Sequence, residues 1–342
     1  MKEILKELSN TNGATGFEEG AAEKVIRLLK GKIDEVYSNK MGSVVGIVNS
    51  TTKSRGRVMI ATHLDELAMI VRKIEKGFIY FSTLGGWDKR VFPGQEVVVY
   101  GKKKLNGVIG AIPPHFFPRD KSKDVYTYDE LFVDVGLDEK NLKKNVMVGN
   151  PIYIRRKFAE LHNGFVTGKA FDNRSSCTVL IDVLLKAKKE NLPYDIFGVF
   201  TVEEEETGLG ARTSSYDIEP DFAIVIDVTH GKSYGVSEGA LEMNKGPVFS
   251  TGPNIHPDIF NGLKSIAEKY EIPYQIDAVP GLTGTDAADI QIVKEGIPCG
   301  LIGIPLRYMH TPVEVINLKD MERTSRVLLS FLKEFEGVGS DL

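Results

Sequence analysis

The spacing of apolar residues changes twice along the chain. Residues 1–8 and 15–32 carry apolar side chains at the spacing of amphipathic helices, and short β-branched runs at 44–48 and 58–62 predict buried strands. From about residue 67 to 163 the pattern changes to short β-branched runs broken by Gly and Pro, which is typical of a small all-β domain. These runs cover residues 67–74, 78–82, 96–100, 105–112, 131–135 and 151–155.

Helix and strand patterns alternate again after Gly168. Such alternation predicts a mostly parallel sheet with helices on both faces. We therefore expect an α/β catalytic domain, residues 1–66 and 164–342, that is interrupted by a barrel-like β insertion at 67–163. The helices are expected at 173–189, 257–270, 286–295 and 318–334, and the strands at 196–202, 222–227, 273–278 and 299–304.

Composition excludes several classes of function. The 342 residues are 42% hydrophobic and 26% charged, as in a globular protein with a sizeable core. The 43 basic and 47 acidic residues are interspersed, so no basic stripe predicts nucleic-acid binding. No apolar run reaches the roughly 18 residues of a membrane span, and we expect a cytoplasmic protein. The two cysteines, Cys177 and Cys299, are too few for a disulfide framework.

Polar residues that directly follow apolar runs are the candidates for chemistry, because ligands gather at the carboxyl ends of strands in open α/β sheets. Taken alone, each such residue is more often a solvated loop residue. Together, two imidazoles and several carboxylates suit zinc and related ions, and five such ligands fit two metals that share one carboxylate. The candidates are His63 with Asp65, Asp172, the run Glu203 to Glu206, Asp227 and His310.

Two local patterns support a metal site. In His63-Leu64-Asp65 the aspartate can accept the second N–H of a metal-bound imidazole and fix its tautomer. The run Glu203 to Glu206 follows a strand that should be buried, where adjacent carboxylates repel one another unless cations are present. The alternatives are a surface aspartate at a turn and a solvated acidic loop.

Nearly the whole chain resembles the tetrahedral (TET) aminopeptidases, a family of dinuclear metallopeptidases also labelled glutamyl aminopeptidase or endoglucanase. As a set, the segments that carry the resemblance are specific. They are Ala61-Thr-His-Leu-Asp-Glu66, Gly168-Lys-Ala-Phe-Asp-Asn-Arg174, Thr201-Val-Glu-Glu-Glu-Glu-Thr-Gly208, Ile226-Asp-Val-Thr229, Thr283-Gly-Thr-Asp-Ala287 and Arg307-Tyr-Met-His-Thr-Pro312.

The resemblance implies a ligand set and an assembly. Asp172 would bridge two divalent ions, zinc or cobalt, with His63 and Asp227 on one ion and His310 with a glutamate on the other. The β-rich insertion would be a dimerisation domain, and the chain would form a homo-oligomer, a dodecamer in this family. Its substrates would be peptides with a free N-terminus.

The run of four glutamates leaves two registers open. Counting back from Gly208 makes Glu205 the general base and Glu206 the metal ligand, whereas counting forward from Thr201 gives Glu204 and Glu205. We prefer the first count, because it keeps the family's Glu-Glu-x-Gly spacing. In that register the surplus Glu204 is free to pair with the substrate's ammonium group.

The predicted mechanism is metal-assisted hydrolysis. Two cations sharing Asp172 would hold a bridging water, lower its pKa enough to supply hydroxide at neutral pH and polarise the scissile carbonyl. Glu205 would move the proton to the leaving amine. A glycoside hydrolase also needs paired carboxylates, but it would leave both histidines unexplained. A non-catalytic assembly protein of the same fold would be expected to lack the base or a ligand, and every candidate position is filled.

Overall fold

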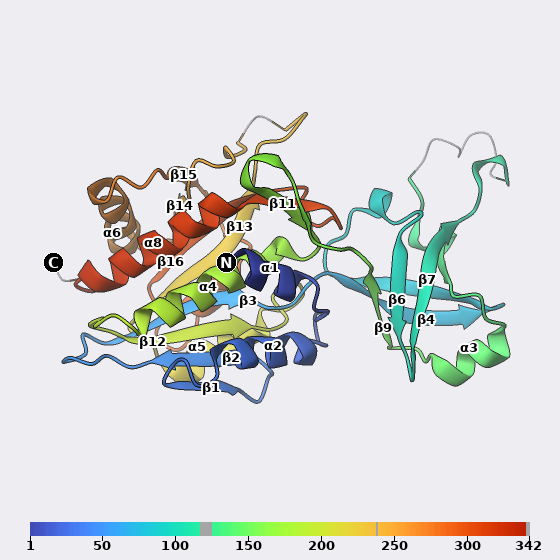
Figure 1. Cartoon of the computed structure of the whole chain (residues 1–342), viewed down its shortest axis with the longest axis horizontal. Helices are drawn as coiled ribbons and strands as arrows, with labels where there is room; N and C mark the ends of the chain where they lie inside the picture. The colour runs from blue at the N-terminus through green and yellow to red at the C-terminus, as the bar shows by residue number, and fades with distance from the viewer. Residues whose placement is uncertain (117–124, 237–238, 340–342) are drawn as a thin grey trace.

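The chain forms two units of regular structure. The computed structural model describes residues 1–116, 125–236 and 239–339. An α/β unit contains both ends of the described chain, and a small β-barrel lies beside it (Figure 1). This arrangement confirms the predicted α/β core with an inserted barrel-like domain.

Four parallel strands form the centre of the large sheet, in the order β12 (Asp195–Thr201), β3 (Arg57–His63), β13 (Phe222–His230) and β16 (Cys299–Arg307). They are runs of buried apolar residues because helices cover both faces.

The outer strands make the sheet mixed, since most of them pair antiparallel to their neighbours. Beside β12 lie β2 (Val44–Val48) and β1 (Glu35–Ser38). Beyond β16 lie β17 (Glu314–Asn317), β11 (Phe165–Gly168) and β10 (Ala159–Glu160), while β14 (Val248–Thr251) pairs with β16 and with β15 (Gln275–Ala278). The parallel pairing expected from the alternation is concentrated in the centre, where it aligns the strand ends that carry the site.

Alternate residues of each central strand face opposite helix layers. In β3, Val58 and Ile60 face one hydrophobic core, and Met59 and Ala61 face the other. The first core contains residues of α1 (Lys2–Ser9), α2 (Glu19–Leu29), α4 (Phe171–Ala187), α6 (Pro257–Lys269) and α8 (Leu318–Glu334) (Figure 1). The second contains residues of α5 (Leu209–Ile218) and α7 (Asp286–Gln291).

Helix α5 was not predicted from the sequence. Its ten residues, Leu-Gly-Ala-Arg-Thr-Ser-Ser-Tyr-Asp-Ile, bury two small polar side chains, Ser214 and Ser215, beside Ala211 and Ile218. A face of this kind lacks the apolar stripe by which an amphipathic helix is recognised.

The inserted barrel closes in the order β4-β5-β8-β7-β6-β9, with every pairing antiparallel. Its interior is apolar, with Phe81, Phe92 and Leu131 fully buried. The strands are β4 (Ala68–Glu75), β5 (Phe78–Leu84), β6 (Glu96–Tyr100), β7 (Lys104–Ala111), β8 (Leu131–Asp134) and β9 (Pro151–Ile154), and α3 (Glu139–Asn145), which was not predicted, precedes β9.

None of the helices in the described ranges has the length and apolar character needed to cross a membrane. Cys177 and Cys299 are both free thiols in buried positions.

Candidate metal centre

Four of the five predicted ligands, all except Glu206, lie together at one edge of the central sheet. β3 ends at His63, which pairs in parallel register with Thr201 at the end of β12. Asp227 lies in β13, and His310 follows the end of β16. Because these four strands run parallel, their carboxyl ends open on the same side of the sheet. Asp172, in the first turn of α4, faces this edge.

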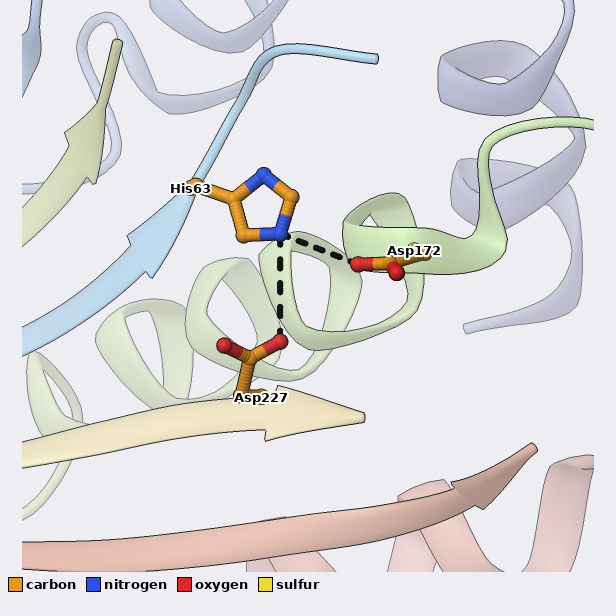
Figure 2. A group of neighbouring side chains, drawn as sticks. All are labelled: His63, Asp172 and Asp227. Carbon is orange, nitrogen blue, oxygen red and sulfur yellow. Dashed lines mark hydrogen bonds and ion pairs between the residues drawn. The ribbon is translucent and has the colours of Figure 1, made fainter. Parts of the chain in front are cut away.

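One group of candidate ligands consists of His63, Asp172 and Asp227. Nε2 of His63 lies 3.0 Å from Oδ1 of Asp172 and 3.8 Å from Oδ1 of Asp227. Figure 2 shows that the imidazole, on β3, points toward both carboxylates, which come from α4 and β13. One donor atom from each residue lies within 4.8 Å of the other two.

A second group shares Asp172 and adds Glu205 and His310. Nε2 of His310 lies 3.4 Å from Oδ2 of Asp172 and 3.7 Å from Oε2 of Glu205. Asp172 therefore presents Oδ1 to one histidine and Oδ2 to the other, the arrangement expected of a bridging carboxylate.

The second nitrogen of each imidazole faces an acceptor. Nδ1 of His63 lies 3.4 Å from Oδ1 of Asp65, and Nδ1 of His310 lies 2.8 Å from the carbonyl oxygen of Gly86. An N–H donated from Nδ1 leaves the Nε2 lone pair free, as in most metal-binding histidines. Asp65, the partner predicted for His63 from the His63-Leu64-Asp65 spacing, is thus its nearest carboxylate at Nδ1, although the 3.4 Å contact does not meet hydrogen-bond geometry.

The carboxylates around the two histidines repel one another. Burial, together with the charge of Asp172, raises the pKa of Asp227 to about 7. Burial and neighbouring carboxylates also raise the pKa values of Glu204 and Glu205 well above their usual range. Burial opposes ionisation of Asp172 as well, but its contacts with His310 and His63 outweigh burial and lower its pKa. Cations placed among these groups would remove the repulsion.

The residues present fit divalent ions. Each group offers one imidazole nitrogen and two carboxylate oxygens, the donor types that zinc binds in catalytic sites. Oε1 of Glu205 is buried and has no hydrogen-bond partner within the described chain. A buried carboxylate oxygen without a donor is costly, and a cation would satisfy it.

The four glutamates lie at different depths. Glu205 is among the ligands of the second group, and Oε2 of Glu204 lies 3.9 Å from Nε2 of His63. Glu206 is exposed and belongs to neither group; its Oε1 accepts a hydrogen bond from the N–H of Gly85 at 2.7 Å. This placement differs from the register preferred above, which made Glu206 the ligand and Glu205 the base. It follows the count forward from Thr201 instead.

The backbone of the acidic loop accounts for this register. Glu203 adopts a left-handed conformation with φ 59°, which turns the chain directly after β12. Oδ1 and Oδ2 of Asp65 then accept the N–H groups of Glu204 and Glu205, each at 3.1 Å. The turn and these two hydrogen bonds bring the second and third glutamates into the site and leave the fourth in solvent.

Sequence reasoning missed Glu314, which joins two ligand segments. Its Oε1 accepts from the N–H of His310 at 3.1 Å, and its Oε2 accepts from the N–H of Asp172 at 3.2 Å. The side chain is buried at the start of β17. A charged residue at the start of the short run Glu314-Val-Ile-Asn317 was the available signal, but the run was not recognised as a strand.

A small cavity opens beside Asp172. Its walls come from both units, with Trp87 and Ile154 from the insertion and Lys169 and Thr311 from the α/β core. Lys169 forms a buried ion pair with Glu66, so the cavity wall carries no uncompensated lysine charge. The insertion therefore helps to shape the space next to the candidate ligands.

Solved structures of aminopeptidases share this fold. A TET aminopeptidase from a marine-sediment Thaumarchaeota archaeon superposes with a TM-score of 0.92 at 32% identity, covering 98% of this chain and 96% of that one. The TET1 peptidase of Pyrococcus horikoshii, which can assemble into a tetrahedron or a large octahedral shell, gives 0.86 at 27% identity, covering 97% and 99%.

Sequence comparison identifies the family. A lysyl aminopeptidase of Pyrococcus furiosus is 31% identical over 98% of this chain and 97% of its own length. The M42 glutamyl aminopeptidase family matches residues 42–327. The chain belongs to this M42 family of aminopeptidases. Both the resemblance to TET aminopeptidases and the prediction of an enzyme that hydrolyses peptide bonds are thereby confirmed.

Proposed function

We propose that this chain is an aminopeptidase that works with two divalent metal ions. His63, Asp172 and Asp227 would hold one ion, and Asp172, Glu205 and His310 would hold the other. The observation that carries the proposal is the placement of Asp172, whose two oxygens lie 3.0 and 3.4 Å from two imidazoles, one at the end of β3 and one in the turn after β16. Mixed nitrogen and oxygen ligands suit zinc or cobalt.

When bound, the two ions would polarise the scissile carbonyl and make a water molecule acidic enough to attack it. The chain's own task is to move the proton. Glu204 is the carboxylate placed for this, since it lies next to His63 but belongs to neither ligand group. Oε2 of Glu204 would take the proton of the water and return it to the leaving amine.

Burial raises the pKa of Glu204 above its usual range, and a carboxylate with a raised pKa takes up a proton more readily. Glu205, which the sequence favoured as the base, has an oxygen 3.7 Å from His310 and is better placed as a ligand. Asp65, on the Nδ1 side of the ring, would orient His63 and fix its tautomer. Glu204 is then occupied by proton transfer and is not assigned to the substrate's ammonium group.

The function is tested by measuring metal content and peptide cleavage on the same protein. The purified enzyme should hold two equivalents of zinc or cobalt, lose cleavage of aminoacyl substrates on chelation and regain it when metal is added. Acetylating the substrate's N-terminus should abolish cleavage, since an aminopeptidase acts only on a free N-terminus. Equal rates on free and acetylated peptides would rule out an aminopeptidase.

Neither alternative explains the site as well. A glycoside hydrolase needs two carboxylates but no imidazole, whereas Asp172 contacts both His63 and His310. The alternative predicts chelator-resistant cleavage of a glucan. A non-catalytic assembly protein would show neither activity.

We also propose that the chain forms a homo-oligomer, with the barrel as the dimer contact. The P. horikoshii relative assembles into closed shells. In this chain the barrel side exposes apolar residues around the end of β7, with Val108 48%, Ile112 38% and Phe116 72% accessible. A dodecamer built from dimers is the expected form, and light scattering measures its mass.

A further inference from the structure

Three consecutive N–H groups of the acidic loop are bound by two buried carboxylates. Asp65 accepts the N–H groups of Glu204 and Glu205, each at 3.1 Å. Oε1 of Glu18 accepts the preceding one, that of Glu203, also at 3.1 Å. Asp65 belongs to the site already described, but Glu18 comes from the N-terminal segment and has no assigned task.

The side chain of Glu18 does not cap the helix at whose start it lies. It is the N-cap residue of α2, yet its side chain makes no capping hydrogen bond to that helix. Its Oε1 accepts instead from the N–H of Gly16, at 2.8 Å, and from that of Glu203. The residue is 7% exposed, and Asp65 is the charged group that faces it. Burying this carboxylate costs free energy, whereas a capping carboxylate at the surface would stay hydrated and avoid that cost.

The N–H that Glu18 binds belongs to the residue that sets the direction of the loop. Glu203 is left-handed with φ 59°, a conformation that costs a non-glycine residue on the order of 1 kcal/mol. Its carbonyl oxygen accepts from Thr207 and Gly208 at 3.0 and 2.9 Å. Because Glu18 accepts its N–H, hydrogen bonds hold both the N–H and the carbonyl oxygen of Glu203.

We propose that Glu18 is a positioning residue for the reaction. By holding the N–H of Glu203, it fixes the turn from which Glu204 and Glu205 project toward His63 and His310. Glu18 belongs to neither group of candidate ligands and does not line the small cavity beside Asp172, so we assign its effect to the loop. The inference rests on the proposed function, because it takes Glu204 as the base and Glu205 as a ligand.

The chain offers a matched set of variants. Glu18→Ala removes the acceptor, and Glu18→Asp keeps the charge but shortens the side chain by one methylene. Glu18→Gln keeps an oxygen at the same reach and removes the charge. The exposed neighbour Glu19, in the first turn of α2, supplies the control Glu19→Ala.

The measurements are kcat and KM on an aminoacyl substrate with metal-loaded enzyme, and zinc affinity by competition with a chromophoric chelator. Glu18→Ala and Glu18→Asp should lower kcat at least tenfold with KM changed less than threefold, because misplacing a catalytic group by about 1 Å can cost a hundredfold. The weaker of the two zinc affinities should fall at least fivefold. Glu18→Gln and Glu19→Ala should stay within threefold of the parent in every value.

Several outcomes would overturn the inference. Parental kcat and zinc affinity in Glu18→Asp would show that the hydrogen bond to Glu203 does not matter, even if Glu18→Ala failed to fold. A Glu18→Gln variant as impaired as Glu18→Asp would show that charge, and not the position of the loop, is what Glu18 supplies. Failure of the proposed function is seen separately, since the parent itself would then bind no zinc or cleave no peptide.

Discussion

Replacing Glu204 by Gln should stop turnover while both metals stay bound. The substitution keeps the shape of the side chain and removes its ability to take a proton. Oε2 of Glu204 lies 3.9 Å from His63, and the residue belongs to neither group of donor atoms, so no ligand is lost. Loss of a general base costs about a hundredfold to ten-thousandfold in rate, or about 3 to 5 kcal/mol of barrier.

The neighbouring glutamates give contrasting expectations. Glu205→Gln replaces a charged oxygen near His310 by a neutral amide and should weaken metal binding at least tenfold, with activity returning in part at high metal concentration. Glu206→Gln is the control. That side chain is exposed, and the amide oxygen can still accept the N–H of Gly85, so kcat and metal content should remain within twofold.

Elemental analysis of each purified variant, combined with kcat at saturating substrate, separates a base from a ligand. The reasoning fails if Glu206→Gln loses a metal while Glu205→Gln stays fully metallated and inactive. That result would restore the register counted back from Gly208, and the loop would then have to rearrange when metal binds.

Three further predictions follow from the same geometry. Asp172→Ala should leave less than one metal per chain, because both groups lose a ligand, and elemental analysis that still finds two would contradict a bridge. Light scattering at micromolar concentration should report an oligomer, and a monomer would refute assembly without touching the chemistry. In metal-depleted protein, burial raises the pKa of Glu18 from 4.5 to about 7, so this group stabilises the fold most below pH 4.5 and loses that contribution as pH rises through 7. Glu18→Gln should therefore gain up to about 3 kcal/mol in unfolding free energy relative to the parent between pH 4.5 and 8, and urea titrations showing a constant difference would contradict this.

The sequence predicted the parts of the fold and site that depend on local pattern. His63 ends a buried strand, Asp227 lies near the end of another and the acidic loop follows a third, and parallel strands bring such residues to one edge without further information. The barrel strands alternate clearly enough to be recognised. The sequence did not predict the elements whose apolar residues lack a clear periodicity. Among them are α5, with its buried serines, and the short antiparallel strands β11 and β17.

Which glutamate we propose as the base and which as a metal ligand depends on one backbone angle. The four consecutive side chains are identical, so the local sequence does not indicate which of them faces the proposed metal site. In the structure, the left-handed conformation of Glu203 directs Glu204 and Glu205 toward the candidate ligands, and carboxylates of Glu18 and Asp65, more than a hundred residues earlier in the chain, bind the N–H groups of Glu203 and Glu204. Spacing from a downstream glycine is no substitute for those contacts.

The buried carboxylates at this edge of the sheet fall into two classes, those that accept backbone N–H groups and those that do not. Oxygens of Asp65, Glu18 and Glu314 accept backbone N–H groups and so fix the loops that carry the ligands. In the part of the chain that the structure describes, neither Glu204 nor Glu205 accepts any hydrogen bond from a backbone N–H, and burial together with neighbouring carboxylates raises the pKa of each well above its usual range. A buried carboxylate that accepts no backbone N–H is suited to take a proton or a cation. For this reason Glu204 and Glu205, and not their better-satisfied neighbours, are the residues to which we assign the chemistry.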